Sequence, residues 1–271
     1  MRNGDRIDLK RIGAAEPAQA DCFAGLHLRY LLDLVAAVLT AGTARRSPLG
    51  QGFRAIGLAE AVSSLYRPAV ERIEFCGGIG AGKSTCAALL AERWSLPLVG
   101  ERFESIPYWQ LYYQDPARYA LEKDLSFLLS HVDTLRAAAA PNLVCDFALF
   151  QTVAYSAIVG DAADTAAVDA VYRQMTVRLG QPALVILLRC DTSIQLDRIR
   201  KRGRAPEQKI TADYLQRLDR AIDEQIDKLP NTVSVIEWDT SRGSPSRLLE
   251  QPAIQAVIDR WSDARSFSDI I

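Results

Sequence analysis

The sequence predicts an α/β fold in which a five-stranded, doubly wound parallel sheet follows an N-terminal helical extension. From about residue 70, short apolar runs alternate with longer stretches of helical periodicity, the pattern of a parallel sheet covered by helices. The continuous apolar run at 183–188 is typical of a central strand that is buried on both faces. The first predicted strand also runs into a glycine-rich loop that opens a helix.

Each element follows from its local pattern. We expect strands at 72–76, 96–99, 143–146, 183–188 and 233–238, and helices at 84–94, 116–139, 164–179, 193–202 and 211–229. The chain divides into a helical extension over 1–70, with helices at 26–39 and 53–66, and a domain over 71–271 that carries every motif described below. The extension shows no catalytic pattern, so we expect it to cover the core or to contact a second subunit.

Composition limits the partners and the compartment. The net charge of −1 gives no electrostatic reason to expect nucleic acid or an anionic membrane as a partner. The five cysteines lack metal-binding spacing, which favours reduced thiols. Residues 1–16 are too polar for a secretory signal, and the apolar stretch at 31–39 is too short to span a bilayer. We therefore expect a cytoplasmic protein.

Residues 77–85, with the sequence GGIGAGKST, fit the phosphate-binding loop pattern of glycine, four residues, then Gly-Lys-Ser. Glycines let backbone N–H groups approach phosphate oxygens, and the helix N-terminus that follows adds partial positive charge. Lys83 is expected to reach the β- and γ-phosphates, and the Ser84 hydroxyl to ligate Mg²⁺. The candidate nucleotide-binding residues are Gly77, Gly78, Gly80, Gly82, Lys83, Ser84 and Thr85. The loop predicts that the chain binds ATP with Mg²⁺.

Two carboxylates follow strands whose carboxyl ends meet the loop. Glu101 follows the second strand, where it can accept a proton from a hydroxyl that attacks the γ-phosphate. Asp146 closes the third strand, where it can hold Mg²⁺ or its waters. The alternatives are a solvated surface carboxylate for Glu101 and a helix cap for Asp146.

A basic segment at 198–207 begins on a helix and enters a loop that contains glycine and proline. Guanidinium groups bind phosphate through two hydrogen bonds and neutralise charge during its transfer. A solvated helix face is the alternative, but a protein that binds ATP needs arginines near the phosphates. We therefore interpret the segment as a lid that closes over the nucleotide.

Four segments follow one another along the chain: 77–85, 101–103 with 107–116, 198–207 and 210–215. By these segments, residues 72–240 resemble the deoxynucleoside kinases, including their bacterial deoxyadenosine/deoxyguanosine kinase-like branch. The resemblance implies a P-loop kinase fold, ATP and Mg²⁺ as cofactors, and a homodimer formed through the helices near 116–139 and 164–179.

The resemblance also implies roles for matching residues. Glu101 would be the general base, acting with Lys83, Arg198 and Arg202 in phosphoryl transfer. Tyr113 and Glu207 would hold the sugar 3′-hydroxyl. The lid arginines would bind phosphates, and these are Arg198, Arg202 and Arg204. Asp239 would lie beside the base of the donor nucleotide.

The chain departs from the family at the pocket for the acceptor's base. Asp124 stands where the family has a Gln that pairs with the base, and His131 stands where the family has an Arg. Phe147 replaces a second Arg, after the acid of the third strand. A carboxylate lacks the donor that a Gln amide offers, so we expect altered acceptor specificity. A contact between Asp124 and His131 is the alternative.

These observations favour a kinase that phosphorylates the 5′-hydroxyl of a deoxynucleoside or nucleoside-like small molecule. Two alternatives stay open at this point: a diverged kinase acting on a non-nucleoside alcohol, and a non-catalytic nucleotide-binding subunit that regulates a partner. A GTPase is disfavoured because the sequence has no Asn-Lys-x-Asp segment for reading guanine.

Overall fold

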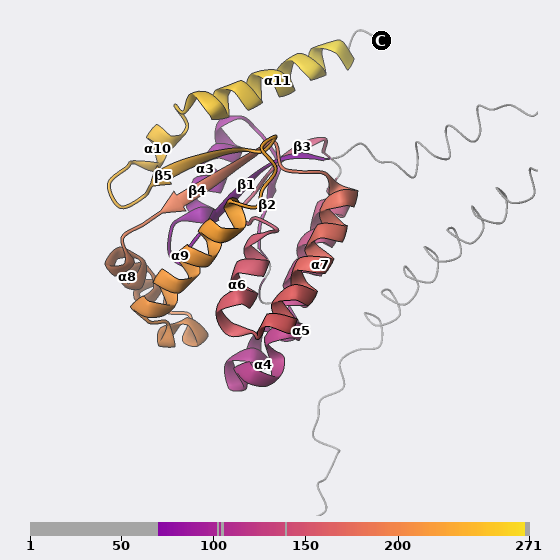
Figure 1. The fold of residues 1–271 in the computed structure, drawn as a ribbon. Helices are drawn as coiled ribbons and strands as arrows, with labels where there is room; N and C mark the ends of the chain where they lie inside the picture. Colours follow the sequence, from indigo (N-terminus) through magenta and orange to yellow (C-terminus); the bar gives the residue numbers. More distant parts are fainter. Residues whose placement is uncertain (1–69, 102, 104–105, 139, 269–271) are drawn as a thin grey trace, which may run out of the picture. The chain divides into compact units, whose positions relative to one another are not determined.

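The computed structural model describes residues 70–101, 103, 106–138 and 140–268 (Figure 1). The helices predicted at 26–39 and 53–66, and with them the proposed extension, lie outside the described residues. In the described ranges, no helix is both long and apolar enough to cross a membrane.

The five predicted strands form one parallel sheet in the order β2-β3-β1-β4-β5. They are β1 (Glu71–Gly77), β2 (Leu98–Val99), β3 (Asn142–Cys145), β4 (Leu184–Arg189) and β5 (Ser234–Asp239). Strand β1 lies at the centre between β3 and β4, both of which are apolar and buried, as the sequence predicted. The strand order therefore reverses beside β1, which is where doubly wound sheets bind ligands.

Helices cover both faces of the sheet (Figure 1). On one face, α3 (Lys83–Arg93) and α11 (Pro252–Ser268) pack against β1 and β4. The other face carries α5 (Pro116–Ala137), α6 (Gln151–Val159), α7 (Ala162–Leu179) and α9 (Ala212–Ile226). The remaining elements are α4 (Trp109–Gln114), α8 (Thr192–Arg202), the 3-10 helix η3 (Ala205–Lys209) and α10 (Pro245–Leu248). The doubly wound α/β fold is confirmed.

Several elements differ from the expectation. Strand β2 is shorter than predicted, and the segment after Gly203 forms η3 where we expected an open loop. Helices α4, α6, α10 and α11 were not predicted. Helix α6 contacts α9, α5 and α7, and five of its nine residues are buried, so it lacks the periodicity that marks a helix at the surface.

A buried ion pair holds the central strand in place. Arg72 Nε lies 2.6 Å from Glu74 Oε1, and both side chains are almost completely buried. Arg72 also donates to the carbonyl oxygens of Leu179 and Gly180 at the end of α7. Glu74 accepts a hydrogen bond from the backbone N–H of Leu149, after β3. The pair thus joins β1 to the end of α7, which precedes β4, and to the segment that follows β3.

We expect Glu74→Ala to destabilise the protein by about 3–5 kcal/mol, because it leaves the Arg72 charge buried without its partner. Urea unfolding measures the change in the free energy of unfolding. The matched control is Glu92→Ala on the exposed side of α3, which should change it by less than about 0.5 kcal/mol. Equal effects of the two substitutions would contradict a structural role for the pair.

Candidate active site

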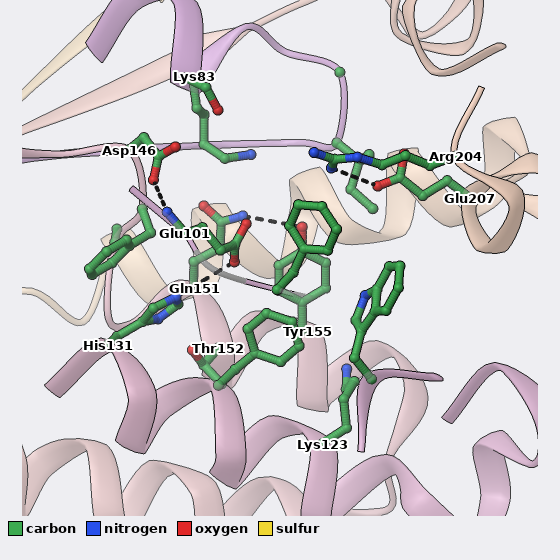
Figure 2. Close-up of a pocket in the computed structure, with 18 of the residues that line it drawn as sticks. Lys83, Glu101, Lys123, His131, Asp146, Gln151, Thr152, Tyr155, Arg204 and Glu207 are labelled. Carbon is green, nitrogen blue, oxygen red and sulfur yellow. Dashed lines mark hydrogen bonds and ion pairs between the residues drawn. The ribbon is translucent and has the colours of Figure 1, made fainter. Parts of the chain in front are cut away.

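One cavity of about 590 Å³ opens at the carboxyl ends of β1 and β3 (Figure 2). The glycine-rich loop and α3 form one wall, and the segments after β2 and β3 form the floor. Helices α4 and α5 line one end, and η3 with the end of α8 closes over the cavity. The predicted residues that line it are Gly80, Gly82, Lys83, Ser84, Thr85, Glu101, Tyr113, Asp124, His131, Asp146, Phe147, Arg198, Arg202, Arg204 and Glu207.

The glycine-rich loop takes a shape that only glycines permit. Gly77 and Gly80 have positive φ angles of 139° and 82°. A Cβ on Gly77 would lie 2.5 Å from the Leu188 carbonyl oxygen, so the protein itself excludes a side chain here. Gly82 precedes α3, and no side chain caps that helix. The first-turn amides of α3 thus form the kind of N-terminus that binds phosphate.

Lys83 and Gln151 hold the start of the loop from two sides. The Lys83 ammonium donates to the carbonyl oxygens of Gly77 and Gly78, at 2.8 and 3.1 Å. The Gln151 amide of α6 accepts from the Gly77 N–H and donates to the Gly77 carbonyl, both at 3.1 Å. Burial lowers the pKa of Lys83, and the charges of Glu101, Cys76 and Asp146 oppose that change.

Glu101 presents its carboxylate to the cavity, and 38% of its side chain is exposed there. Its Oε1 lies 3.6 Å from His131 Nε2 (Figure 2). Burial raises the pKa of Glu101, but the favourable interactions with His131, Lys83 and Arg204 outweigh burial and bring the pKa below its ordinary value. Glu101 is therefore an ionised carboxylate at neutral pH, which is the form that accepts a proton.

The pKa of Asp146 shifts in the opposite direction from that of Glu101. Its Oδ1 accepts a hydrogen bond of 2.7 Å from the backbone N–H of Glu101. Burial and the negative charge of Glu101 raise the pKa of Asp146, although a hydrogen bond from the Ser84 side chain opposes them. The Ser84 and Asp146 oxygens thus lie together, beside the phosphate-binding loop. They fit Mg²⁺, which takes one or two protein oxygens and completes its shell with phosphates and waters.

The lid residues are joined by ion pairs. Glu207 of η3 pairs with both Arg202 and Arg204, and Arg204 also stacks over the Phe103 ring at 3.9 Å. Burial raises the pKa of Tyr113, and the charge of Glu207 adds to this effect. Tyr113 and Glu207, for which the family resemblance implies one shared task, therefore lie near each other in this cavity.

Arg198, the first residue of the predicted lid segment, contacts Gly80 and Thr240 and takes no part in the ion pairs with Glu207. It donates to the Gly80 carbonyl at 3.0 Å, and to the hydroxyl and carbonyl oxygens of Thr240. A smaller cavity of about 260 Å³ lies here, lined by Gly82, Thr85, Cys86, Arg198, Thr240 and Pro245. Asp239 lines neither cavity; it is exposed and accepts a hydrogen bond from the Ser241 N–H. Its assignment beside a donor base stays a prediction.

The end of the cavity formed by α5 holds Asp124 and His131, for which a mutual contact was the alternative interpretation. Asp124 and His131 do not pair with each other. Instead Asp124 Oδ1 lies 2.7 Å from Lys123 Nζ, and Asp124 Oδ2 has no partner among the described residues. Burial raises the pKa of Asp124, and Lys123 opposes that change. His131 stacks face to face on Phe147, with ring centroids 3.8 Å apart.

Sequence reasoning missed several residues of the cavity. Lys123 and Gln151 carry polar contacts there, and further wall residues include Trp109, Tyr112, Phe127, Thr152, Tyr155 and Tyr214. Gln151 could have been found from the sequence, because it is a polar residue at the start of an apolar segment, five residues after Asp146. Lys123 has no comparable signal, because a lysine in a long helix usually lies at the surface.

Comparisons with known proteins agree with this geometry. The deoxynucleoside kinase family model matches residues 73–263. Deoxyguanosine kinase of Bacillus subtilis (strain 168) is 26% identical over 148 residues, which are 52% of this chain and 72% of that protein. Deoxyadenosine kinase of Lactobacillus acidophilus is 30% identical over 165 residues, which are 55% of this chain and 76% of that protein.

Solved structures show the same fold. The structure of deoxyadenosine kinase from M. mycoides with bound dATP has a TM-score of 0.58 and 22% identity, and the match covers 70% of this chain and 99% of that one. The dCTP-bound structure of that enzyme has a TM-score of 0.57 and 21% identity, covering 71% and 99%. Since the family model matches most of the chain, the predicted family and enzyme class are confirmed: this protein is a nucleoside kinase of the deoxynucleoside kinase family.

Proposed function

We propose that this enzyme transfers the γ-phosphoryl group of ATP to the 5′-hydroxyl of a deoxynucleoside, with Mg²⁺, and that Glu101 is the general base. The observation that carries the proposal is the position of Glu101. An ionised carboxylate shares one cavity with a phosphate-binding loop and with the arginines of a lid. A non-catalytic phosphate-binding site needs no such base.

In the proposed reaction, Glu101 accepts the proton of the acceptor hydroxyl as its oxygen attacks the γ-phosphorus. The new O–P bond forms while the bond to the β-phosphate oxygen breaks, and ADP leaves. Lys83 and the lid residues Arg202 and Arg204 offset the negative charge on the phosphates. Tyr113 and Glu207 hold the sugar and place the 5′-hydroxyl beside Glu101.

Ser84 and Asp146 would hold Mg²⁺, which when bound neutralises charge on the β- and γ-phosphates. Asp146 also fixes Glu101 through the hydrogen bond to its backbone N–H. Asp146 would thus hold the metal, and Glu101 would accept the proton. Arg198 would act on the phosphates mainly by holding Gly80 and the chain at Thr240 in place.

The relatives support a deoxynucleoside as the acceptor, because they are named deoxyguanosine and deoxyadenosine kinases. A kinase that acts on a non-nucleoside alcohol is the second candidate. The observation that favours it is the α5 end of the cavity, where Asp124, His131 and Phe147 replace the residues that the family resemblance leads one to expect there.

We also propose that the enzyme is a cytoplasmic homodimer that contacts its partner through α5 and α7. Two large apolar side chains on these helices are exposed: Leu129 by 45% and Val177 by 81%. Covering such side chains would favour association of two subunits. The absence of nucleic acid and membrane partners stays a prediction from the net charge.

Glu101→Gln should lower kcat by about 10²-fold or more, because an amide cannot accept the proton. ADP release is measured with ATP, Mg²⁺ and a panel of deoxynucleosides, ribonucleosides and simple alcohols, and ATP binding is measured by calorimetry. ATP affinity should change little. Glu122→Gln, on an exposed position of α5, is the matched control and should retain full turnover. Full turnover by the Glu101 variant would remove this residue from the mechanism.

His131→Asn should move the acid limb of kcat/KM to higher pH. Glu101 must be ionised to act, and its lowered pKa keeps it ionised below the ordinary carboxyl value of 4.5. Removing His131 deletes the largest lowering influence and leaves burial, which raises the pKa. The measurement is kcat/KM from about pH 3.5 to 8, a range that includes the wild-type limb. Phe147→Leu removes the stacking partner of His131 without removing a charge, so it should leave the limb in place. A limb that stays unmoved in His131→Asn would contradict the assignment.

A further inference from the structure

Lys123 and Asp124 form a charged pair at the α5 end of the cavity, away from the phosphate-binding loop. Their side chains are 9% and 3% exposed, and both line the cavity. Figure 2 shows the Lys123 ammonium directed from α5 toward the cavity. It lies 4.4 Å from the centre of the Tyr112 ring and 5.7 Å from that of Tyr155.

The pair leaves hydrogen-bonding capacity unused. An ammonium has three donors, and Asp124 takes one of them at 2.7 Å. The Asp124 carboxylate has a second oxygen, Oδ2, which is buried and has no partner in the described part of the chain. An unpaired buried carboxylate oxygen costs free energy that a ligand's N–H group would recover. The wall therefore offers a charged donor beside a charged acceptor.

The surroundings define the shape of the ligand at this end. Aromatic rings form much of the wall here, from Trp109, Tyr112, Phe127, Phe147 and Tyr155. Flat rings of this kind favour a planar heterocycle, which stacks against them. A planar ring whose edge meets a donor and an acceptor side by side fits a nucleobase.

We propose that Lys123 and Asp124 determine acceptor specificity, and that they select nucleobases with a lactam edge, in which a carbonyl oxygen stands beside a ring N–H. This proposal rests on the proposed function and names the substrate class of the same site. Lys123 donates to the carbonyl oxygen, and Asp124 accepts from the ring N–H. Guanine, hypoxanthine, thymine and uracil carry such an edge.

Adenine and cytosine carry an amino group beside an unprotonated ring nitrogen. Their amino group is a weaker acid than a lactam N–H, and their ring nitrogen replaces the carbonyl oxygen as the acceptor. An amino group that faces Lys123 would also place a donor against a donor. A hydrogen bond to a charged group gains most from a strong donor or a strong acceptor on the base. Lys123 therefore favours the lactam carbonyl, and Asp124 favours the lactam N–H.

The test compares acceptors that differ only at this edge: deoxyinosine with deoxyadenosine, and deoxyuridine with deoxycytidine. The wild-type enzyme is assayed for kcat/KM with ATP and Mg²⁺, and nucleoside affinity is measured by calorimetry without ATP. We expect kcat/KM to be about 10- to 100-fold higher for the lactam member of each pair. This ratio corresponds to the free energy of one hydrogen bond to a charged group.

The double variant Lys123→Met with Asp124→Leu removes both charges together, because a single change would leave one charge buried without its partner. For this variant, the ratio of kcat/KM between the lactam and the amino member of each pair should fall toward one. Its melting temperature should stay near that of the wild type. Lys228→Met, an exposed lysine after α9, is the matched control and should keep the wild-type ratios.

Three results would overturn the proposal, and they separate its failure from that of the proposed function. A wild-type enzyme that phosphorylates deoxynucleosides but prefers the amino member, or neither, refutes the specificity and leaves the function intact. A folded double variant that keeps the lactam preference assigns specificity to other residues. If the wild-type enzyme phosphorylates no nucleoside at all, both the proposed function and the proposed specificity are refuted.

Discussion

The phosphate-binding loop at the end of β1 is held in shape by the protein around it, and the rest of the site depends on this. Gly77 is bonded through both its N–H and its carbonyl to the amide of Gln151. Lys83 donates to the carbonyls at the start of the loop, and Arg198 to the carbonyl of Gly80. These contacts come from the protein itself and hold the backbone of the loop in one shape, which limits the ordering that phosphate binding would require.

The same contacts connect the phosphate-binding loop with the α5 end of the cavity. Gln151 lies on α6, and its amide also donates to the hydroxyl of Tyr155 at 3.4 Å. Tyr155 forms part of the wall against which Lys123 lies. A chain of direct contacts thus runs from the phosphate-binding loop to the α5 end of the cavity. Beside it, the environment gives two neighbouring carboxylates different acidities: Glu101 has a lowered pKa and Asp146 a raised one.

Much of this site could be predicted from the sequence, because its parts belong to local motifs. The spacing of 77–85 determines the strand, loop and helix, and Glu101 and Asp146 follow strands whose ends must meet at one edge of the sheet. The lid arginines were found in the same way, from a short basic segment. Their position in the cavity agrees with the expectation, while their individual roles remain proposals.

The remaining residues could not be predicted, because tertiary packing decides their environment. Lys123 enters the cavity only because α5 presents it there, between Asp124 and two tyrosine rings. Nothing in the sequence distinguishes it from an exposed lysine. Because α5, α7 and α9 pack around α6 and bury most of it, periodicity did not reveal this helix or the contact of Gln151 with the loop.

We propose that one cavity brings a nucleotide's γ-phosphate to a nucleoside hydroxyl. The most direct test is to identify the products by phosphorus NMR after ATP has been fully consumed in the presence of Mg²⁺ and a mixture of deoxynucleosides. We expect a deoxynucleoside 5′-monophosphate and ADP in equal amounts. ADP with inorganic phosphate, or phosphate attached at the 3′-oxygen, would contradict the arrangement of Glu101 and the sugar-binding residues described above.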